Sequence, residues 1–391
     1  MNVPRIDLRK KVTDALDHAP VCLLLGPRQA GKTSLARELA PGDDNYFDLE
    51  NMVDLRRLEE NAQGELGRLY GLVVIDEAQR LPAIFPILRY LADRTGNAAK
   101  FLLLGSASPY LMEGASESLA GRVAYVDMGG FNVGELEPQF HEQLWLQGGL
   151  PPAFLEDETH SFNWRLNYLR SLVEQDLRAI AETRLAPAAL RRLVLLLAQS
   201  NGQVWNHSAA SRVLSVDYKT IQRHLDLLEG MFLIRLLPPF ERNLNKRLRK
   251  SPKLYFRDMG LMHSLLSIRS QRDLRTHPQF GFSWEGFALE QVIRVLGLRE
   301  TDCFNYAVHS GDEMDLVVER GGRRYGFEFK AGDSPGTTPS ILNSARDLGL
   351  ERVFVIYPGN KDYGLNERIE VVAARNLAAL ALRWNSASAV V

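Results

Sequence analysis

The sequence predicts an α/β protein in which a parallel sheet with flanking helices comes first and a smaller α/β domain ends the chain. The first observation is a glycine-rich loop that stands between an apolar run, Val21 to Leu25, and a helical pattern. The second is a pair of later apolar runs, within residues 72–79 and 101–108, each ending in polar residues. The third is a return to strand and helix alternation in the last third of the chain. Such alternation is typical of parallel sheets.

Length and composition limit the protein classes to consider. A chain of 391 residues is too long for one ordinary core, so we expect two or three domains. Hydrophobic residues make up 45% and charged residues 24%, as in ordinary globular proteins. The formal net charge of −1 excludes a whole-protein attraction to nucleic acid, so any such site must be a local basic patch.

Three features bear on the cellular compartment. Cys22 and Cys303 lie far apart, so we expect neither a disulfide framework nor a metal cluster, which fits a reducing cytosol. The N-terminus carries no apolar signal core. No apolar run approaches the length of a membrane span. We therefore expect a cytoplasmic protein without membrane contact.

The loop after the first apolar run carries the phosphate-binding pattern GxxxxGK(S/T). Its glycines let backbone N–H groups turn toward phosphate oxygens, and the helix expected at 33–40 adds its partial positive charge. Lys32 is expected to reach the β- and γ-phosphates of a nucleotide, and the Thr33 hydroxyl to bind Mg²⁺. A chance glycine-rich turn is disfavoured because strand, loop and helix are in register. The expected nucleotide-binding residues are Gly26, Pro27, Arg28, Gln29, Ala30, Gly31, Lys32, Thr33 and Ser34.

A second motif, LVVIDEAQ, spans Leu72 to Gln79. Its buried run has the form of a Walker B strand, which delivers a carboxylate to the Mg²⁺ side of a nucleotide. Asp76 is expected to hold the metal through water, and Glu77 to polarise the attacking water as a general base. Acidic strand ends are common, but a position about 45 residues after Lys32 in an alternating pattern strengthens this interpretation.

The other elements of the first third complete the expected sheet. Helices are expected at 5–18, 53–61 and 83–93, with strands at 46–50 and 101–108 and a fifth beginning after Gly121. Ser106 ends a strand, where ligands bind in parallel sheets, and is interpreted as a sensor of the γ-phosphate. A helix-capping role for this serine is the alternative. Arg122 is either an arginine finger, acting in its own subunit or in a neighbour, or a salt-bridged surface residue.

The motifs GPRQAGKTS, YFDLE, LVVIDEAQ, LLLGSAS and SLAGR occur in an order and spacing that resemble the prokaryotic AAA-type ATPases with a C-terminal domain of unknown function. WLQGGLPPAF, Trp145 to Phe154, is similar to the turn that follows the ATPase core in that family, and Arg165 to Leu177 to the next helix. The resemblance covers nearly the whole chain. It implies an ATPase followed by a C-terminal domain with a restriction-endonuclease-like fold.

The region from 186 to 239 predicts a winged helix-turn-helix module. Helical periodicity around 190–197, 208–213 and 218–231 is followed by a strand-like run. The recognition helix would expose Tyr218, Lys219, Gln222 and Arg223 to DNA. The basic stretch 242–253 would contact phosphates beside it through Arg242, Lys246 and Arg247. Winged helices also serve as packing or protein-contact modules, so this alternative stays open.

The last third predicts the second α/β core. The helix at 284–296 contains Glu285 and Glu290, a strand contains Asp315, and a hairpin return carries Glu328 and Lys330. Strand alternation places Glu328 and Lys330 on one face, and a turn at Gly321-Gly322 can bring Asp315 beside them. We expect Glu290, Asp315 and Glu328 to hold Mg²⁺ or Mn²⁺, with Lys330 stabilising a hydroxide or a phosphate oxygen. The alternative is an internal ion pair between Asp315 and Lys330 in a fold without this chemistry.

These observations predict a P-loop NTPase parallel sheet with flanking helices, a winged-helix module and a small restriction-endonuclease-like α/β domain. The expected boundaries are 1–135 for the ATPase, 136–185 for a helical lid or connector, 186–260 for the winged helix and 261–391 for the last domain. ATP and Mg²⁺ are the expected ligands, and DNA and a second copy of the chain are candidate partners. The ATPase either gates a nuclease in DNA processing or defence, or acts as a regulatory switch with a non-catalytic binding module.

Overall fold

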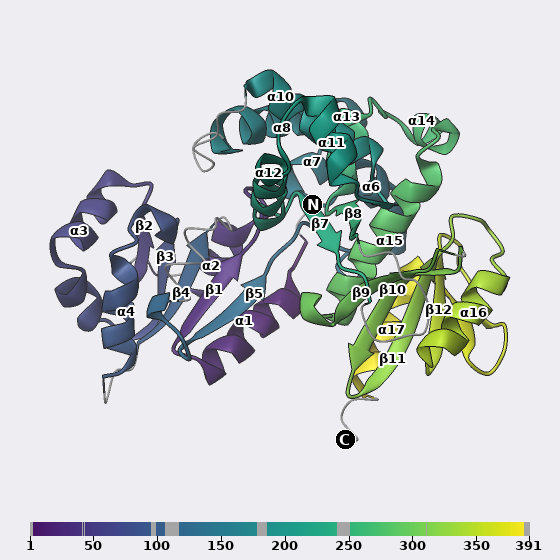
Figure 1. The fold of residues 1–391 in the computed structure, drawn as a ribbon. Coiled ribbons are helices and arrows are strands. Elements are labelled where there is room, and N and C mark those ends of the chain that lie inside the picture. Colours follow the sequence, from purple (N-terminus) through teal and green to yellow (C-terminus); the bar gives the residue numbers. More distant parts are fainter. Residues whose placement is uncertain are drawn as a thin grey trace. The chain divides into compact units, whose positions relative to one another are not determined.

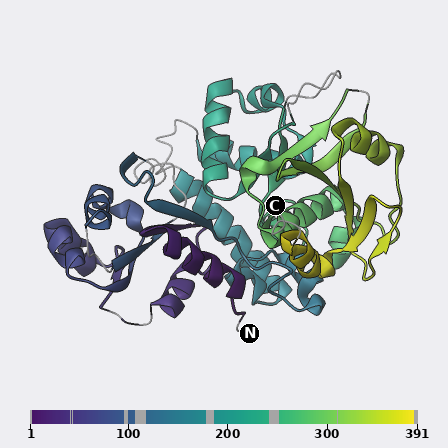
Figure 2. The same ribbon diagram turned by 90° about the horizontal axis from the view of Figure 1, so that it is seen from below.

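The computed structural model describes residues 3–40, 42, 44–94, 99–105, 117–177, 186–240, 251–309 and 311–386. The chain divides into two compact units (Figures 1 and 2). The first consists of residues 1–130 with 226–233, and the second of residues 131–225 with 234–391. Among the described residues, no helix is both long and apolar enough to cross a membrane.

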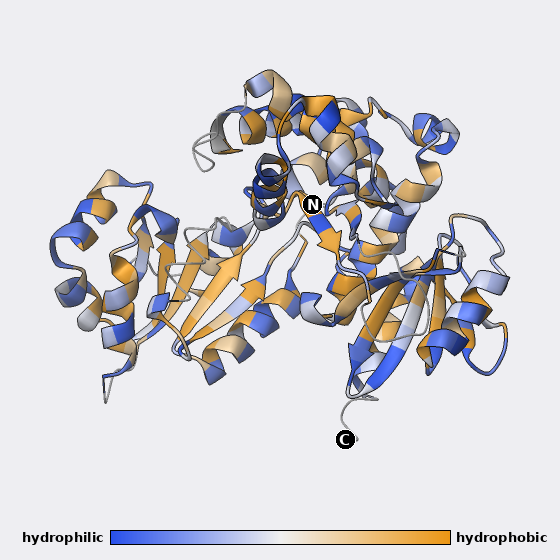
Figure 3. Ribbon diagram, viewed as in Figure 1, coloured by the Kyte–Doolittle hydropathy of each residue, from blue (hydrophilic) through white to orange (hydrophobic). Residues whose placement is uncertain are grey.

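The first unit is built on a parallel sheet of five strands in the order β2-β3-β4-β1-β5. Its central strands are buried on both faces, and Figure 3 shows them as mostly hydrophobic. Burial on both faces explains the continuous apolar runs in the sequence. The strands are β1 (Val21–Leu25), β2 (Tyr46–Asp48), β3 (Gly71–Asp76), β4 (Ala99–Gly105) and β5 (Val123–Asp127).

Helices cover both faces of this sheet. Alternate side chains of β1, such as Leu23, pack into one core with Leu58 and Leu88. The helices on this face are α3 (Met52–Gly67) and α4 (Ile84–Ala92). On the opposite face, α1 (Ile6–His18) and α2 (Lys32–Leu39) lie against the sheet and bury residues such as Val12 and Leu35.

Helix α3 is longer than the expected 53–61, because it continues past a kink. Asn61 has non-helical dihedral angles of −154° and 56° within α3. Its side chain accepts a hydrogen bond from the Gly64 N–H at 3.0 Å, as an N-cap residue does. The helix therefore restarts where the periodicity of the sequence is interrupted.

The second unit begins with helices and a small antiparallel sheet in the order β6-β8-β7. Asp157 caps the long helix α8 by accepting hydrogen bonds from two backbone N–H groups. The elements are α6 (His141–Gln147), α7 (Pro151–Phe154), α8 (Glu158–Ser171), α10 (Pro187–Gln199), β6 (Gln203–Val204), α11 (His207–Leu214), α12 (Tyr218–Gly230), β7 (Ile234–Leu237), β8 (Lys253–Phe256), α13 (Met259–Leu265) and α14 (Gln271–Thr276). Helix α12 is shared, because its residues from Asp226 onward belong to the first unit.

The last third forms a mixed sheet of six strands in the order β13-β14-β12-β11-β10-β9. Val353 and Val355 face one core with α16, while Phe354 between them contacts Trp384 of α17 on the other face. The elements are α15 (Phe280–Leu296), β9 (Cys303–Ala307), β10 (Glu313–Arg320), β11 (Arg323–Phe329), α16 (Pro339–Leu348), β12 (Arg352–Tyr357), β13 (Tyr363–Gly364), β14 (Ile369–Ala373) and α17 (Leu377–Ser386).

Candidate functional site

The phosphate loop joins the end of β1 to the start of α2, and two glycines fix its path. A Cβ on Gly26 would lie 2.0 Å from the carbonyl oxygen of Met128, so no larger residue fits there without a shift of the backbone. Gly31 has φ +97°, a conformation that side chains disfavour. Between them, Arg28 and Gln29 are exposed and Ala30 is buried.

Lys32 points back into this loop. Its ammonium donates hydrogen bonds of 2.9 Å to the carbonyl oxygens of Gly26 and Pro27, and only 7% of the residue is exposed. Burial lowers the pKa of Lys32 to about 8, against the opposing effect of the Glu77 and Asp76 carboxylates. This buried ammonium lies beside the glycine loop, where it can donate a further hydrogen bond to an anionic oxygen.

The hydroxyl of Thr33 donates a hydrogen bond to Oδ2 of Asp76 at 2.8 Å. Thr33 lies in the first turn of α2, and Asp76 is the last residue of β3, where it is 5% exposed. The structure therefore brings the hydroxyl of the loop and the carboxylate of the acidic strand together, as their motifs predict. A hydroxyl and a carboxylate side by side are ligands that suit Mg²⁺.

Glu77 follows Asp76 in a left-handed conformation with φ +53°. Such a φ is uncommon for a residue with a side chain. Gln79 donates a hydrogen bond to the Glu77 carboxylate. Burial raises the pKa of Glu77, and the neighbouring Asp76 adds to this effect while the bond from Gln79 opposes it. A half-buried carboxylate with a raised pKa is suited to act as a base.

The structure also brings residues to this site that sequence reasoning missed. Tyr46, at the start of β2, donates a 2.7 Å hydrogen bond from its hydroxyl to Oδ2 of Asp76. The guanidinium of Arg37 lies 3.5 Å from the centre of the Tyr46 ring. Arg5 donates hydrogen bonds to the carbonyl oxygens of Ala30 and Gly129. The signal for Tyr46 was its place in the strand YFDLE, next to β3 in the sheet.

Arg122 lies away from the phosphate loop of its own chain. It precedes β5, and Val123 pairs in register with Val21, so Arg122 is at the edge of the sheet opposite the loop. Its guanidinium donates two hydrogen bonds to Asp93 at 2.6 and 2.9 Å. An arginine-finger role in the same subunit is therefore wrong, and the surface salt bridge is what the chain forms. Ser106, the expected sensor, lies outside the described residues, and Ser34 is exposed on α2.

In the C-terminal sheet, the hairpin of β10 and β11 brings Asp315 beside the end of β11. Oδ2 of Asp315 accepts a hydrogen bond from the Phe329 N–H at 3.1 Å. The Lys330 ammonium donates to Oε1 of Glu328 at 2.6 Å, so these two side chains share one face as the alternation predicts. Asp315 and Glu328 are 4% and 3% exposed. The alternative considered for this site, an ion pair between Asp315 and Lys330, is not formed, because Asp315 pairs with Lys253 and Lys330 with Glu328.

The partner of Asp315 is Lys253 of β8, the last residue of the basic stretch expected to contact DNA phosphates, which is instead buried with only 5% of its surface exposed. The Lys253 ammonium donates to Oδ1 of Asp315 at 2.9 Å and to Oε1 of Glu285 at 3.1 Å. The hydroxyl of Tyr255 donates to the same Glu285 oxygen at 2.7 Å. Burial first, and then the charge of Asp315, raises the pKa of Glu285 to about 7 and that of Glu328 to about 8.

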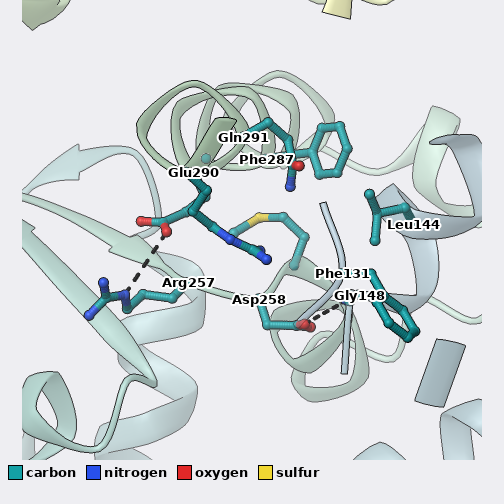
Figure 4. A pocket seen from close by; sticks show the side chains of 12 residues that line it. Phe131, Leu144, Gly148, Arg257, Asp258, Phe287, Glu290 and Gln291 are labelled. Atoms are coloured by element: carbon teal, nitrogen blue, oxygen red, sulfur yellow. Dashed lines mark hydrogen bonds and ion pairs between the residues drawn. The ribbon is translucent and has the colours of Figure 1, made fainter. Parts of the chain in front are cut away.

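Glu290 is not part of this cluster, so its expected role as a metal ligand beside Asp315 is wrong. Glu285 and Glu290 are five positions apart on α15, which turns them about 140° from each other around the helix axis. Glu290 instead forms a buried ion pair with Arg235 of β7. Figure 4 shows Glu290 with its second partner, Arg257, at the edge of a pocket. On its other side Asp258 accepts a hydrogen bond from the Gly149 N–H.

Helix α12 carries the residues expected to contact DNA. Asp217 precedes this helix, and its carboxylate accepts a hydrogen bond from the Thr220 N–H at 2.9 Å. Tyr218, Lys219 and Arg223 are exposed, while Gln222 is half-buried. The basic residues Arg242, Lys246 and Arg247 lie outside the described residues.

The parallel sheet with its glycine loop and paired Thr33 and Asp76 defines the first unit as a P-loop ATPase domain of the AAA type. A model of the AAA domain matches residues 18–137. Two domains of unknown function match the rest, DUF8612 over residues 139–272 and DUF4143 over residues 280–377.

Two curated proteins are similar to nearly the whole chain. They are the uncharacterized proteins Rv2008c of Mycobacterium tuberculosis and Mb2031c of Mycobacterium bovis. Each is 41% identical over 376 residues, which cover 96% of this chain and 84% of theirs. The chain therefore belongs to the family of AAA-domain proteins that includes these two.

Among solved structures, the Walker-type ATPase PABY2304 of Pyrococcus abyssi is similar over 68% of this chain and 96% of its own, with 18% identity and a TM-score of 0.46.

Proposed function

We propose that this chain binds ATP with Mg²⁺ and hydrolyses it to ADP and phosphate. The observation that carries the proposal is the 2.8 Å hydrogen bond between the Thr33 hydroxyl and the Asp76 carboxylate. These two groups come from the phosphate loop and from the acidic strand, which are 43 residues apart. Both lie where the ends of parallel strands bind ligands.

Each residue of the site has a defined task in this reaction. Lys32 exchanges its loop carbonyl partners for phosphate oxygens, and the loop from Gly26 to Ser34 surrounds the phosphates. Thr33 and Asp76 hold the Mg²⁺, which neutralises charge on the phosphates when it is bound. Glu77 orients the attacking water and accepts its proton as the bond between the β- and γ-phosphates breaks. Ser106 is proposed as the sensor, and Arg122 can act only on a nucleotide bound by a second copy of the chain.

The variant Lys32→Ala tests this proposal. We expect nucleotide binding and phosphate release to fall below detection, because the variant removes the ammonium that contacts the phosphates. The control is Lys100→Ala, which removes an exposed ammonium paired with Asp17 on the surface of the same domain. Unchanged turnover in Lys32→Ala, with the folded state verified by circular dichroism, would overturn the assignment of the site.

We further propose the domain division 1–135, 136–185, 186–260 and 261–391, with a winged helix in the third part. The order α10, β6, α11, α12, β7, β8 is the order of helices and strands in that module, which supports the proposal. If it binds DNA, the exposed Lys219 and Arg223 contact phosphates. Replacing both by alanine then reduces DNA affinity and lowers its salt dependence, whereas replacing the exposed Arg191 and Arg192 does not. Equal DNA affinity of the Lys219/Arg223 and the Arg191/Arg192 double variants would count against DNA binding by the winged helix.

The purpose of ATP hydrolysis has two candidate explanations. The order α15, β9, β10, β11, α16, β12 supports the restriction-endonuclease-like fold proposed for the last domain, which would make it a nuclease gated by ATP. However, the carboxylates of that domain are occupied by lysine ammonium groups. This observation favours the second explanation, in which the ATPase is a regulatory switch with a non-catalytic binding module. If the protein cleaves any form of DNA with Mg²⁺ or Mn²⁺, and Asp315→Ala or Lys330→Ala loses this cleavage, the explanation as a nuclease gated by ATP would be favoured instead.

A further inference from the structure

A buried lysine occupies the centre of the carboxylate cluster in the second unit. Lys253 is 5% exposed, and its ammonium lies within 3.1 Å of both Glu285 and Asp315. The lysine belongs to β8, in the small antiparallel sheet, whereas the two carboxylates belong to α15 and β10. A charged group from one sheet is therefore held against one acidic residue of a helix and one of another sheet.

The oxygens that a divalent cation needs are largely engaged. Oδ1 of Asp315 binds Lys253, and Oδ2 accepts from the Phe329 N–H. Oε1 of Glu285 accepts from both Lys253 and Tyr255, and Oε1 of Glu328 accepts from Lys330. Oε2 of Glu328 is buried without a hydrogen-bond partner. In the part of the chain that the structure describes, no three acidic, histidine or cysteine residues are arranged to hold a metal ion.

We propose that the Lys253 ammonium is a resident cation that takes the place of a divalent metal ion between Glu285 and Asp315. A metal ion bound to an oxygen at about 2.2 Å, next to an ammonium on that same oxygen, would face strong repulsion in a buried site. The metal ion is therefore excluded while β8 holds Lys253 in place. The metal-dependent nuclease chemistry expected from the sequence does not fit these residues as they are paired.

The charges of the cluster agree with this proposal. Three carboxylates, Glu285, Asp315 and Glu328, face two ammonium groups, Lys253 and Lys330. The two ammonium groups therefore offset two of the three carboxylate charges. Removal of Lys253 would leave three carboxylates with one ammonium group and so increase the attraction of the cluster for a divalent cation.

Titration of the nucleotide-free protein with Mn²⁺, followed by the electron paramagnetic resonance signal of the free ion, tests the proposal. Wild type and Asp315→Asn should bind the same number of Mn²⁺ ions. Lys253→Met should bind one additional ion, which the double variant Lys253→Met with Asp315→Asn loses. The matched control is Lys361→Met, which removes an exposed ammonium from the same unit and should leave Mn²⁺ binding unchanged.

Two results would overturn the proposal. One is a Mn²⁺ ion on wild type that Asp315→Asn removes, because the cluster would then bind metal beside Lys253. The other is a folded Lys253→Met that binds no additional ion. If Lys253→Met does not fold, the comparison of wild type with Asp315→Asn still decides whether metal is excluded. The experiment contains no nucleotide, so its outcome is independent of the proposed ATP hydrolysis.

Discussion

The hydroxyl of Tyr46 donates a 2.7 Å hydrogen bond to the same carboxylate oxygen of Asp76 that accepts from Thr33. Tyr46 comes from β2 and Asp76 from the adjacent β3, so the sheet itself sets the distance between them. Burial raises the pKa of Tyr46, and the bond to Asp76 adds to this effect, so the hydroxyl remains a donor at neutral pH. Tyr46 thus fixes the orientation of a carboxylate proposed to hold Mg²⁺.

Replacement of Tyr46 by phenylalanine is predicted to raise the Mg²⁺ concentration required for half-maximal nucleotide binding by about 10-fold. The physical reason is the loss of the hydrogen bond that orients Asp76. Fluorescent nucleotide titrations at several Mg²⁺ concentrations measure this effect. Nucleotide affinity without Mg²⁺ should stay the same. Tyr70→Phe, at a residue that is 74% exposed, is the control, and an equal shift in both variants would contradict the role of Tyr46.

Replacement of Glu77 by glutamine is predicted to slow ATP turnover by about 100-fold or more, because the amide cannot accept a proton from water. Nucleotide affinity should change little, since Glu77 is not proposed to contact the phosphates in the ground state. Phosphate release and equilibrium binding measure the two properties separately. The control is Glu59→Gln, an exposed residue of α3. A Glu77→Gln protein with normal turnover would rule out the general-base assignment.

Replacement of Glu290 by glutamine is predicted to lower the free energy of unfolding by about 3 kcal/mol, because the buried Arg235 keeps its charge, loses its buried partner and retains only the half-exposed Glu300. Urea unfolding measures this change. For comparison, Glu351→Gln disrupts the exposed pair with Arg323 and should cost less than about 1 kcal/mol. Similar costs for the two variants would show that burial of the Arg235 pair does not matter.

His263 is predicted to make the protein less stable in acid. Its Nδ1 donates to the Leu146 carbonyl, its Nε2 accepts from Ser283, and burial lowers the pKa of His263 to about 3 from an ordinary value of 6.5. Because the unfolded chain binds the proton first, stability is complete above pH 6.5 and falls by about 1.4 kcal/mol per pH unit below it.

The acid effect is measured by urea unfolding between pH 4.5 and 7.5. In His263→Gln the free energy of unfolding should change less steeply with pH than in wild type. The difference should correspond to about one proton, whatever the absolute stability of the variant. The control is His160→Gln, because the pKa of the exposed His160 is raised by its bond to Asp157 and contributes with the opposite sign. A slope in His263→Gln equal to that of wild type would refute the prediction.

The order of elements and the course of the phosphate loop of the first unit could be predicted because short sequence patterns encode them. The glycine loop needs only the residues from Gly26 to Thr33, and the apolar run before Asp76 marks a buried strand. The place of Arg122 could also have been predicted. A residue that precedes a parallel strand lies at the edge of the sheet opposite the ligands.

Sequence reasoning chose Glu290 rather than Glu285 for the acidic cluster, and no local pattern corrects this choice, because both lie on one helix that is buried nearly all round. Only tertiary packing determines that Glu285 forms an ion pair with Lys253 and that Glu290 forms one with Arg235. The sequence by itself thus determined the P-loop domain and the residues proposed to bind ATP, since these are local in the chain. The tertiary structure alone decided the pairing of Lys253 with Asp315, 62 residues apart, because such a contact depends on how separate sheets pack.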